Sequence, residues 1–232
     1  MTSETFTILA HRALLFGPDR AAENTLPAIT AAHREGLPIE FDITIDEHGE
    51  RLVLSHDVAP WTAQREPRDL LALPALASPH ALNVKDLCAL PEILDLLERH
   101  DAVSRVFLFD FELVSAGRRS ARYLMRSVQE RGFAVAHRVS EREPFAREHA
   151  ADDSVSTIWL DEFGRDGLQE ADVRLLVDAG KRCVYVSPDL HRRETPATLR
   201  ARWLEVTSWG VHGICTDYPI ALRSVLEGAT ST

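Results

Sequence analysis

The sequence predicts an α/β fold, a parallel (β/α)8 or TIM barrel in a single domain. Eight short runs of β-branched and other apolar residues alternate with longer segments whose apolar residues recur every three or four positions. The chain has 232 residues, 45% of them hydrophobic, which falls in the range where such a barrel closes as one unit. We therefore expect one domain over residues 1–232, without repeats or linkers.

The predicted strands share an apolar centre and carry polar residues toward their carboxyl ends. They cover residues 6–12, 38–43, 81–85, 106–111, 134–140, 157–161, 182–188 and 213–217. The predicted helices have helical apolar spacing, and most of them stop at a glycine. They cover residues 25–35, 86–100, 120–131, 168–179 and 197–209. This alternation is typical of strands that are parallel and covered by helices.

Two segments interrupt the alternation. Residues 52–55 form an extra extended piece after the turn predicted at 47–49, and this piece would bring His56 back over the mouth of the barrel. Four prolines break any regular pattern within 57–80, so we expect a short loop or insertion there that could cover the site.

Composition excludes some partners. The formal net charge is −10, and phosphate backbones are bound by basic patches, so nucleic acid is not an expected partner. No apolar run reaches the length that spans a bilayer, and residues 1–12 enter a strand without a basic leader region. We expect a soluble, cytoplasmic protein. The sequence leaves its oligomeric state open.

The second predicted strand carries two acids. Glu40 and Asp42 alternate with Ile39, Phe41 and Ile43, and because side chains on a strand alternate between its faces, both carboxylates should leave the same face. Neighbouring carboxylates raise each other's pKa unless a cation lies between them. A divalent metal ion is therefore the expected occupant, and the two acids should lie together with His11 and Lys85.

Several short motifs resemble those of the glycerophosphodiester phosphodiesterases, in the superfamily that includes the phosphatidylinositol-specific phospholipases C. The matching segments are His11-Arg12, Glu23-Asn24-Thr25, Glu40-x-Asp42, His56-Asp57 and the GICTDYP run at 213–219. The sequence is similar to a divergent member, since Ala13 stands where that family usually has glycine and Ala22 where it usually has proline. On the third strand, Asn83-Val84-Lys85 stands where the family usually has Glu-x-Lys.

The resemblance implies a metal-dependent phosphoric diester hydrolase that cleaves a glycerophosphodiester, a small molecule, to an alcohol and glycerol phosphate. His11 and His56 would be the acid and base, because the unperturbed pKa of imidazole lies close to neutral pH. Arg12 and Lys85 would bind the phosphate. Asn24 could either cap the first helix or contact the site.

The same resemblance implies a metal site. Glu40 and Asp42 would be oxygen ligands for Mg²⁺ or Ca²⁺, with Asn83 or Asp110 as a third. Two alternatives to hydrolysis stay open, because the sequence does not show whether water or a substrate hydroxyl attacks, and because asparagine offers a carbonyl oxygen without charge. One is a phospholipase-like lyase that forms a cyclic phosphate, and the other is a noncatalytic barrel that binds a phosphate compound.

Overall fold

The computed structural model describes residues 6–164 and 167–230. Within them the chain forms one sheet in the order β1-β9-β8-β7-β6-β5-β4-β2-β3, and β1 also pairs with β2. The strands are β1 (Thr7–His11), β2 (Ile39–Ile45), β3 (Leu52–Leu54), β4 (His80–Val84), β5 (Val106–Phe109), β6 (Ala134–Val139), β7 (Thr157–Leu160), β8 (Arg182–Val186) and β9 (Gly213–Thr216). This pairing closes the eight parallel strands into the hydrogen-bonding order of a (β/α)8 barrel, which confirms the predicted fold class.

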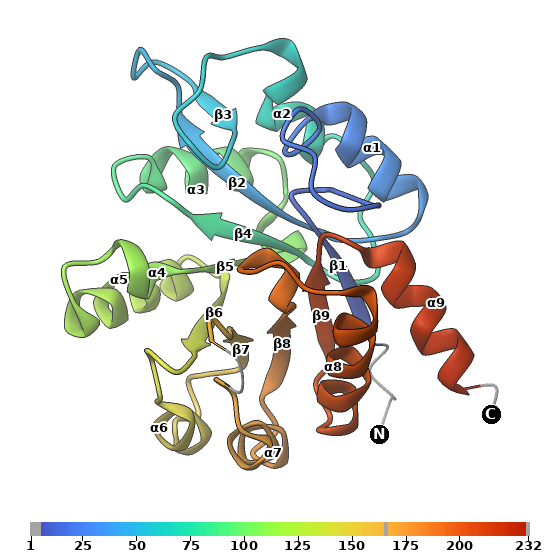
Figure 1. Ribbon diagram of the computed structural model, residues 1–232. Coiled ribbons are helices and arrows are strands. Elements are labelled where there is room, and N and C mark those ends of the chain that lie inside the picture. Colours follow the sequence, from blue (N-terminus) through green and yellow to red (C-terminus); the bar gives the residue numbers. More distant parts are fainter. Residues whose placement is uncertain (1–5, 165–166, 231–232) are drawn as a thin grey trace. The chain divides into compact units, whose positions relative to one another are not determined.

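Helices follow the parallel strands (Figure 1). They are α1 (Leu26–Arg34), α2 (Pro67–Leu71), α3 (Leu90–Arg99), α4 (Phe111–Val114), α5 (Arg118–Glu130), α6 (Ala146–Ala151), α7 (Glu170–Asp178), α8 (Pro196–Ser208) and α9 (Pro219–Thr230). Short 3-10 turns cover Ala63–Arg65, Val103–Arg105 and Pro188–Leu190. No helix of the described residues is both long and apolar enough to cross a bilayer.

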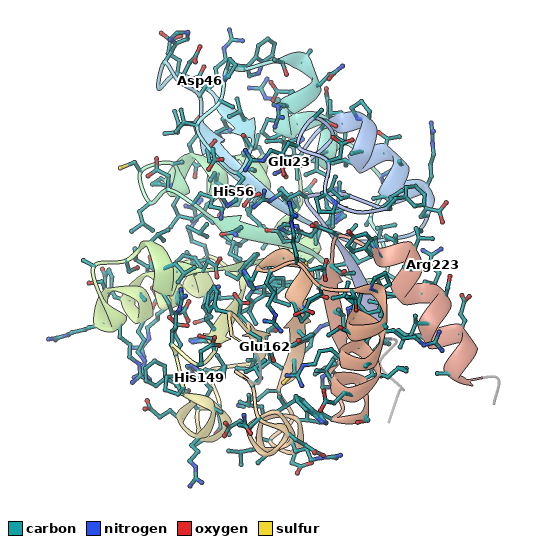
Figure 2. The ribbon with its side chains drawn as sticks, in the orientation of Figure 1. Glu23, Asp46, His56, His149, Glu162 and Arg223 are labelled. Carbon is teal, nitrogen blue, oxygen red and sulfur yellow. The ribbon has the colours of Figure 1, made fainter. Side chains whose placement is uncertain are left out.

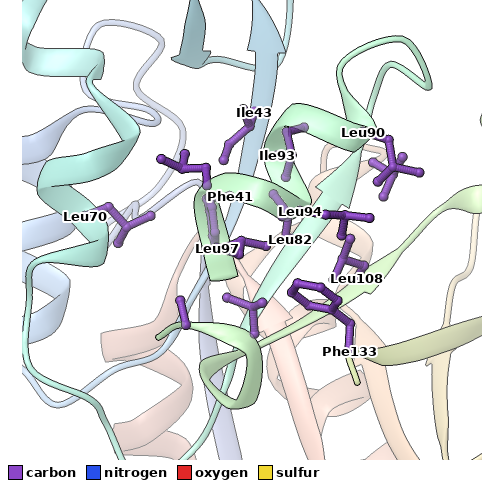
Figure 3. Packing of buried hydrophobic residues seen from close by; sticks show 14 of the residues in the cluster. Phe41, Ile43, Leu70, Leu82, Leu90, Ile93, Leu94, Leu97, Leu108 and Phe133 are labelled. Carbon is purple, nitrogen blue, oxygen red and sulfur yellow. The ribbon is translucent and has the colours of Figure 1, made fainter. Parts of the chain in front are cut away.

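The chain divides into two compact units, which are described separately: residues 10–135, and residues 6–9 with 136–230. In the first unit, β2 pairs in parallel with β4, and β4 with β5. One face of these strands packs under α3, where Phe41, Leu82, Leu108 and Ile93 form a buried cluster (Figure 3). This apolar packing fixes the register of β2, because a shift of one residue would place its acids in the core.

In the second unit, β7, β8 and β9 pair in parallel and pack against helices through a second apolar cluster. Buried ion pairs follow the strands of this unit: Arg138 contacts Asp161, and Glu162 lies between Arg192 and Arg202. Trp159, in β7, is buried.

Two expectations on secondary structure are wrong. Residues 57–80 are not only a loop, because Pro67 begins helix α2 and the side chain of Glu66 accepts the N–H of Arg68 there. The fourth strand ends at Phe109 and not at residue 111, since Asp110 takes the left-handed conformation (φ 70°) and α4 begins at once. Asp110 and Glu112 therefore do not leave one strand face as a pair.

His80, the first residue of β4, gives the fold a dependence on pH. Its Nδ1 accepts the N–H of Ile39 at 3.0 Å, and its ring lies edge-on to Phe41. Burial, followed by the charges of Arg105 and His33, lowers the pKa of His80 from 6.5 to about 4. The imidazole therefore stays neutral in the folded protein at a pH where it is protonated in the unfolded chain.

We expect the free energy of unfolding to fall as the pH is lowered from about 6.5 to about 4, with His80 contributing about 2 to 3 kcal/mol of that loss. In this window the unfolded state binds more protons, so stability rises with pH. A His80→Asn variant can still accept the Ile39 N–H but does not titrate. Urea unfolding at several pH values should show a flatter profile for this variant, and an unchanged profile would contradict the assignment.

Candidate active site

Glu40 and Asp42 leave the same face of β2, as predicted. Their side chains are 2% and 0% exposed, while Ile39, Phe41 and Ile43 pack into the core on the other face. Two carboxylates without water around them are costly unless cations and hydrogen-bond donors surround them. The residues around these acids supply both.

Asp42 lies at the centre of the cluster. Its Oδ2 accepts the side-chain N–H of Asn24 at 2.9 Å and lies 3.5 Å from Nε of Arg12. Its Oδ1 lies 3.5 Å from Nζ of Lys85. Arg12 and Lys85 therefore both contact the carboxylate of Asp42, and Lys85 lies near the two acids as predicted.

Glu40 contacts the end of β1. Its Oε2 accepts the backbone N–H of Arg12 at 3.2 Å and lies 3.8 Å from Nε2 of His11. Burial, and then the charge of Asp42, raise the pKa of Glu40 to about 7, against the opposing charges of His11, Lys85 and Arg12. An additional cation between the two acids would favour the ionised form of both.

A tight turn after β1 positions Arg12. Arg12 and Ala13 both have positive φ, at 48° and 65°, a backbone conformation in which glycine is favoured. The guanidinium is held by Glu23, whose Oε2 accepts Nη1 at 2.9 Å. Glu23 thus orients the guanidinium of Arg12, a contact that its motif alone did not reveal.

Strand β3 brings the residue before His56 next to the backbone of Asp42. That strand runs antiparallel to β2, and the N–H of Ser55 donates to the backbone oxygen of Asp42 at 3.1 Å. The extra extended piece predicted at 52–55 is therefore confirmed. His56 is labelled in Figure 2. Its Nδ1 lies 2.9 Å from a carboxylate oxygen of Asp57, and its side chain is 32% exposed.

Asp57 is exposed, and its carboxylate pairs with His56. The hydrogen bond and charge of His56 lower the pKa of Asp57, and the charges of Arg12 and Arg20 lower it further. Asp57 therefore remains ionised and can hold the imidazole through Nδ1, which leaves Nε2 as the nitrogen to face a substrate.

The fit of the site to a metal ion can be judged from its oxygens. Asp42 and Asn83 are register partners on β2 and β4, and Oδ1 of each is buried without a hydrogen-bond partner. Two such oxygens beside Glu40 fit a hard cation. Within residues 6–164 and 167–230, no three His, Cys, Asp or Glu side chains are grouped to hold a metal, so the third oxygen would be the Asn83 amide. Asp110 follows β5, and its role as a ligand stays a prediction.

Asn24 holds the cluster together and does not cap α1. The N-cap of that helix is Thr25, while the Asn24 side chain receives the Asp42 N–H at 3.2 Å and donates to its carboxylate. Asn24 is fully buried and has a φ of 55°. Asparagine is among the residues that tolerate this conformation, so one residue meets both requirements.

Replacing Asn24 by alanine should lower the free energy of unfolding by about 2 to 4 kcal/mol, because two buried hydrogen bonds are lost and alanine is strained at this φ. Asn24→Gly removes the same bonds without the strain, so it should be about 1 kcal/mol more stable than Asn24→Ala. Chemical unfolding of the two variants measures this difference. Equal stabilities would show that the backbone conformation is unimportant.

Comparisons with known proteins agree with this arrangement at the level of the fold. No family model matches the chain, and no curated protein does. Among solved structures, a candidate glycerophosphodiester phosphodiesterase from Galdieria sulphuraria is 15% identical, with a TM-score of 0.72 over 98% of this chain and 100% of the other. The chain has the fold of that protein.

Two further structures support the same conclusion. A glycerophosphoryl diester phosphodiesterase from Parabacteroides distasonis is 14% identical, with a TM-score of 0.70 over 99% of this chain and 89% of its own. A candidate glycerophosphoryl diester phosphodiesterase from Agrobacterium tumefaciens is 17% identical, with a TM-score of 0.69 over 97% and 99%. The resemblance read from the motifs is thus matched by the fold.

The polar residues that follow β8 and β9 contact one another. Ser187 and Asp189 hydrogen-bond each other, and the N–H of Asp217 donates to Asp189 at 2.8 Å. Trp61 donates to Glu66 at 3.2 Å and lies under the guanidinium of Arg51. Asp189 therefore links the polar residues that follow β8 and β9, and Trp61 is held within the segment that follows β3.

Proposed function

We propose that this chain is a phosphoric diester hydrolase that cleaves a glycerophosphodiester to an alcohol and glycerol phosphate. The observation that carries the proposal is the buried pair Glu40 and Asp42, with His11, Arg12 and Lys85 in contact with it. The fold that carries this pair is shared with proteins named as glycerophosphodiester phosphodiesterases, and this likeness supports the same reaction.

Arg12 and Lys85 are the proposed phosphate-binding groups. Both contact Asp42 and keep about a fifth of the side chain exposed, at 20% and 22%. Nη1 of Arg12 donates to Glu23 and its Nε faces Asp42, so the exposed part of the guanidinium would supply the donors for a phosphate oxygen. These cations would stabilise the charge that gathers on the nonbridging oxygens as the ester bond breaks.

His56 is the proposed general acid, and His11 the base that takes a proton from the attacking hydroxyl. Asp57 orients His56 through Nδ1, as the base of an acid–base pair is oriented in other hydrolases. His11 lies beside Glu40, whose carboxylate favours the imidazolium that forms when a proton is taken up.

Glu40, Asp42 and the Asn83 amide would hold a divalent ion, Mg²⁺ or Ca²⁺. Such an ion, when bound, neutralises phosphate oxygens and lowers the pKa of a coordinated hydroxyl. The buried Oδ1 atoms of Asp42 and Asn83, neither of which accepts a hydrogen bond, support this part of the proposal.

The test uses purified protein with glycerophosphocholine and bis(p-nitrophenyl) phosphate, in the presence of Mg²⁺, Ca²⁺ or a chelator. We expect turnover with metal, little with chelator, and glycerol phosphate as the product in phosphorus NMR. A cyclic phosphate would identify the lyase alternative instead. No turnover with any metal, together with equal phosphate binding by wild type and His11→Ala, would leave a noncatalytic barrel.

A further inference from the structure

The outer face of helix α5 carries a row of arginines. The helix turns its apolar side inward through Ala121, Met125 and Val128. Arg119, Arg122 and Arg126 are spaced by three and four residues, so they share the opposite side, and all three are exposed. Tyr123 lies beside them and is 75% exposed. We call these four residues the basic face.

The basic face contrasts with the charge of the whole chain. From position 113 to position 129 there is no Asp or Glu, while Arg118, Arg119, Arg122 and Arg126 add four positive charges. The net charge of −10 therefore leaves −14 for the remaining residues (−10 − 4). Because charges are screened beyond about 8 Å at physiological salt, a surface that approaches α5 meets mainly these arginines.

Apolar surface adjoins the arginines. Helix α4, which precedes α5 and packs against it, exposes 52% of Leu113. Strands β4 and β5 are parallel, so their carboxyl ends lie at the same edge of the sheet. Lys85 follows β4 at this edge, and α4 and then α5 follow β5 (Figure 1). The basic face thus begins at the edge of the unit that carries the candidate active site.

We propose that the basic face binds the headgroup surface of an anionic lipid membrane. Arginines bind lipid phosphates and carboxylates, and their positive charge favours the negative potential of such a surface. Tyrosine is enriched at the boundary between headgroups and acyl chains, and an exposed leucine beside it can enter the same layer. This inference depends on the surface of α5 and not on the proposed hydrolase activity.

A nucleic acid is the other polyanion that arginines bind, and two observations favour the membrane. Leu113 and Tyr123 offer exposed apolar surface, for which a phosphate backbone has no use. The charge of −14 on the rest of the chain repels a long polyanion that extends beyond one helix, whereas a flat membrane can contact the basic face alone.

The test is flotation of the full chain with vesicles of phosphatidylcholine alone or of phosphatidylcholine and phosphatidylserine in equal parts. We expect binding only to the mixed vesicles, and its loss at high salt. Arg119→Glu with Arg126→Glu should weaken the partition coefficient by at least about 25-fold, from roughly fivefold per arginine. Leu113→Ser with Tyr123→Ser should weaken it as well.

A matched control carries the same total charge. Arg147 and Arg200 are exposed arginines of α6 and α8, so Arg147→Glu with Arg200→Glu changes the net charge equally and should leave binding intact. Equal loss in both double variants would show a dependence on total charge and overturn the proposal. So would binding to duplex DNA without binding to mixed vesicles. Thermal unfolding confirms that the variants are folded, and hydrolysis of bis(p-nitrophenyl) phosphate reports the proposed activity separately.

Discussion

A His56→Ala variant should lose between about 100-fold and 10,000-fold in kcat for glycerophosphocholine, the usual contribution of a positioned acid or base. The imidazole is oriented by Asp57, and the preceding residue is anchored to β2 by the hydrogen bond from Ser55 to Asp42. Removing it takes away a proton donor and leaves Arg12 and Lys85 to bind the phosphate. KM should therefore change less than kcat.

The control for this variant is His48→Ala. His48 lies in the turn between β2 and β3, and 71% of its side chain is exposed. Its imidazole pairs with the neighbouring Glu47 on the surface, so we expect normal kcat and an unchanged unfolding temperature. Activity of His56→Ala above about a tenth of wild type would remove His56 from the reaction. Partial rescue by added imidazole would support the assigned role.

The two histidines should also act together. If His11 and His56 serve one reaction, the loss in the double alanine variant should be much smaller than the product of the two single losses, because each loss already disables the same step. Steady-state kinetics on the three variants provides this comparison. Losses that multiply fully would indicate that the two side chains act independently.

The strands were predictable because their period is two and their apolar content is high. The alternation of Glu40 and Asp42 with Ile39, Phe41 and Ile43 gave the correct face for both acids. The same period of two applies to β4, where Asn83 is the register partner of Asp42. Contacts set by a regular strand can therefore be derived from sequence.

Contacts that depend on loop conformation were not predictable. The Asn24 side chain reaches Asp42 across 18 positions from a left-handed residue, and neither feature has a periodic signal. A capping role and a contact with the site were equally consistent with the sequence. Only the path of the chain between β1 and α1 distinguishes them.

The expectation of a loop over residues 57–80 is wrong for a different reason. Prolines were read as breaks in regular structure, but proline is favoured in the first turn of a helix, where its missing N–H is not required. Helices α1, α2, α3 and α8 all have a proline at this place. Pro67, preceded by Glu66 as a cap, had the same local signal as the helices that were predicted.

Asp42→Asn should abolish the response of the protein to divalent ions and lower its stability. In the wild type we expect Mg²⁺, Ca²⁺ or Mn²⁺ to raise the unfolding temperature, because an ion that binds only the folded state stabilises it. The variant keeps the size of the side chain but loses its charge, and Oδ1 of Asp42 is one of the two buried oxygens proposed to face the ion. Calorimetry should detect no metal uptake.

Loss of the carboxylate also leaves Arg12 and Lys85 without their shared partner. Removing one side of a buried ion pair costs about 3 to 5 kcal/mol, and partial exposure of both cations reduces the expected loss to about 2 to 3 kcal/mol. Asp42→Asn with Lys85→Met should therefore lose less than the sum of the single variants.

Asp46→Asn is the matched control for the metal response. Asp46 follows β2 directly, and its side chain accepts the N–H of Glu50 at 2.8 Å, a bond that asparagine can also accept. Metal uptake should be unchanged in this variant. If Asp42→Asn binds the ions as wild type does, the pair of acids on β2 is a structural partner of Arg12 and Lys85. The phosphate would then be bound by those two cations without a metal ion held at Asp42.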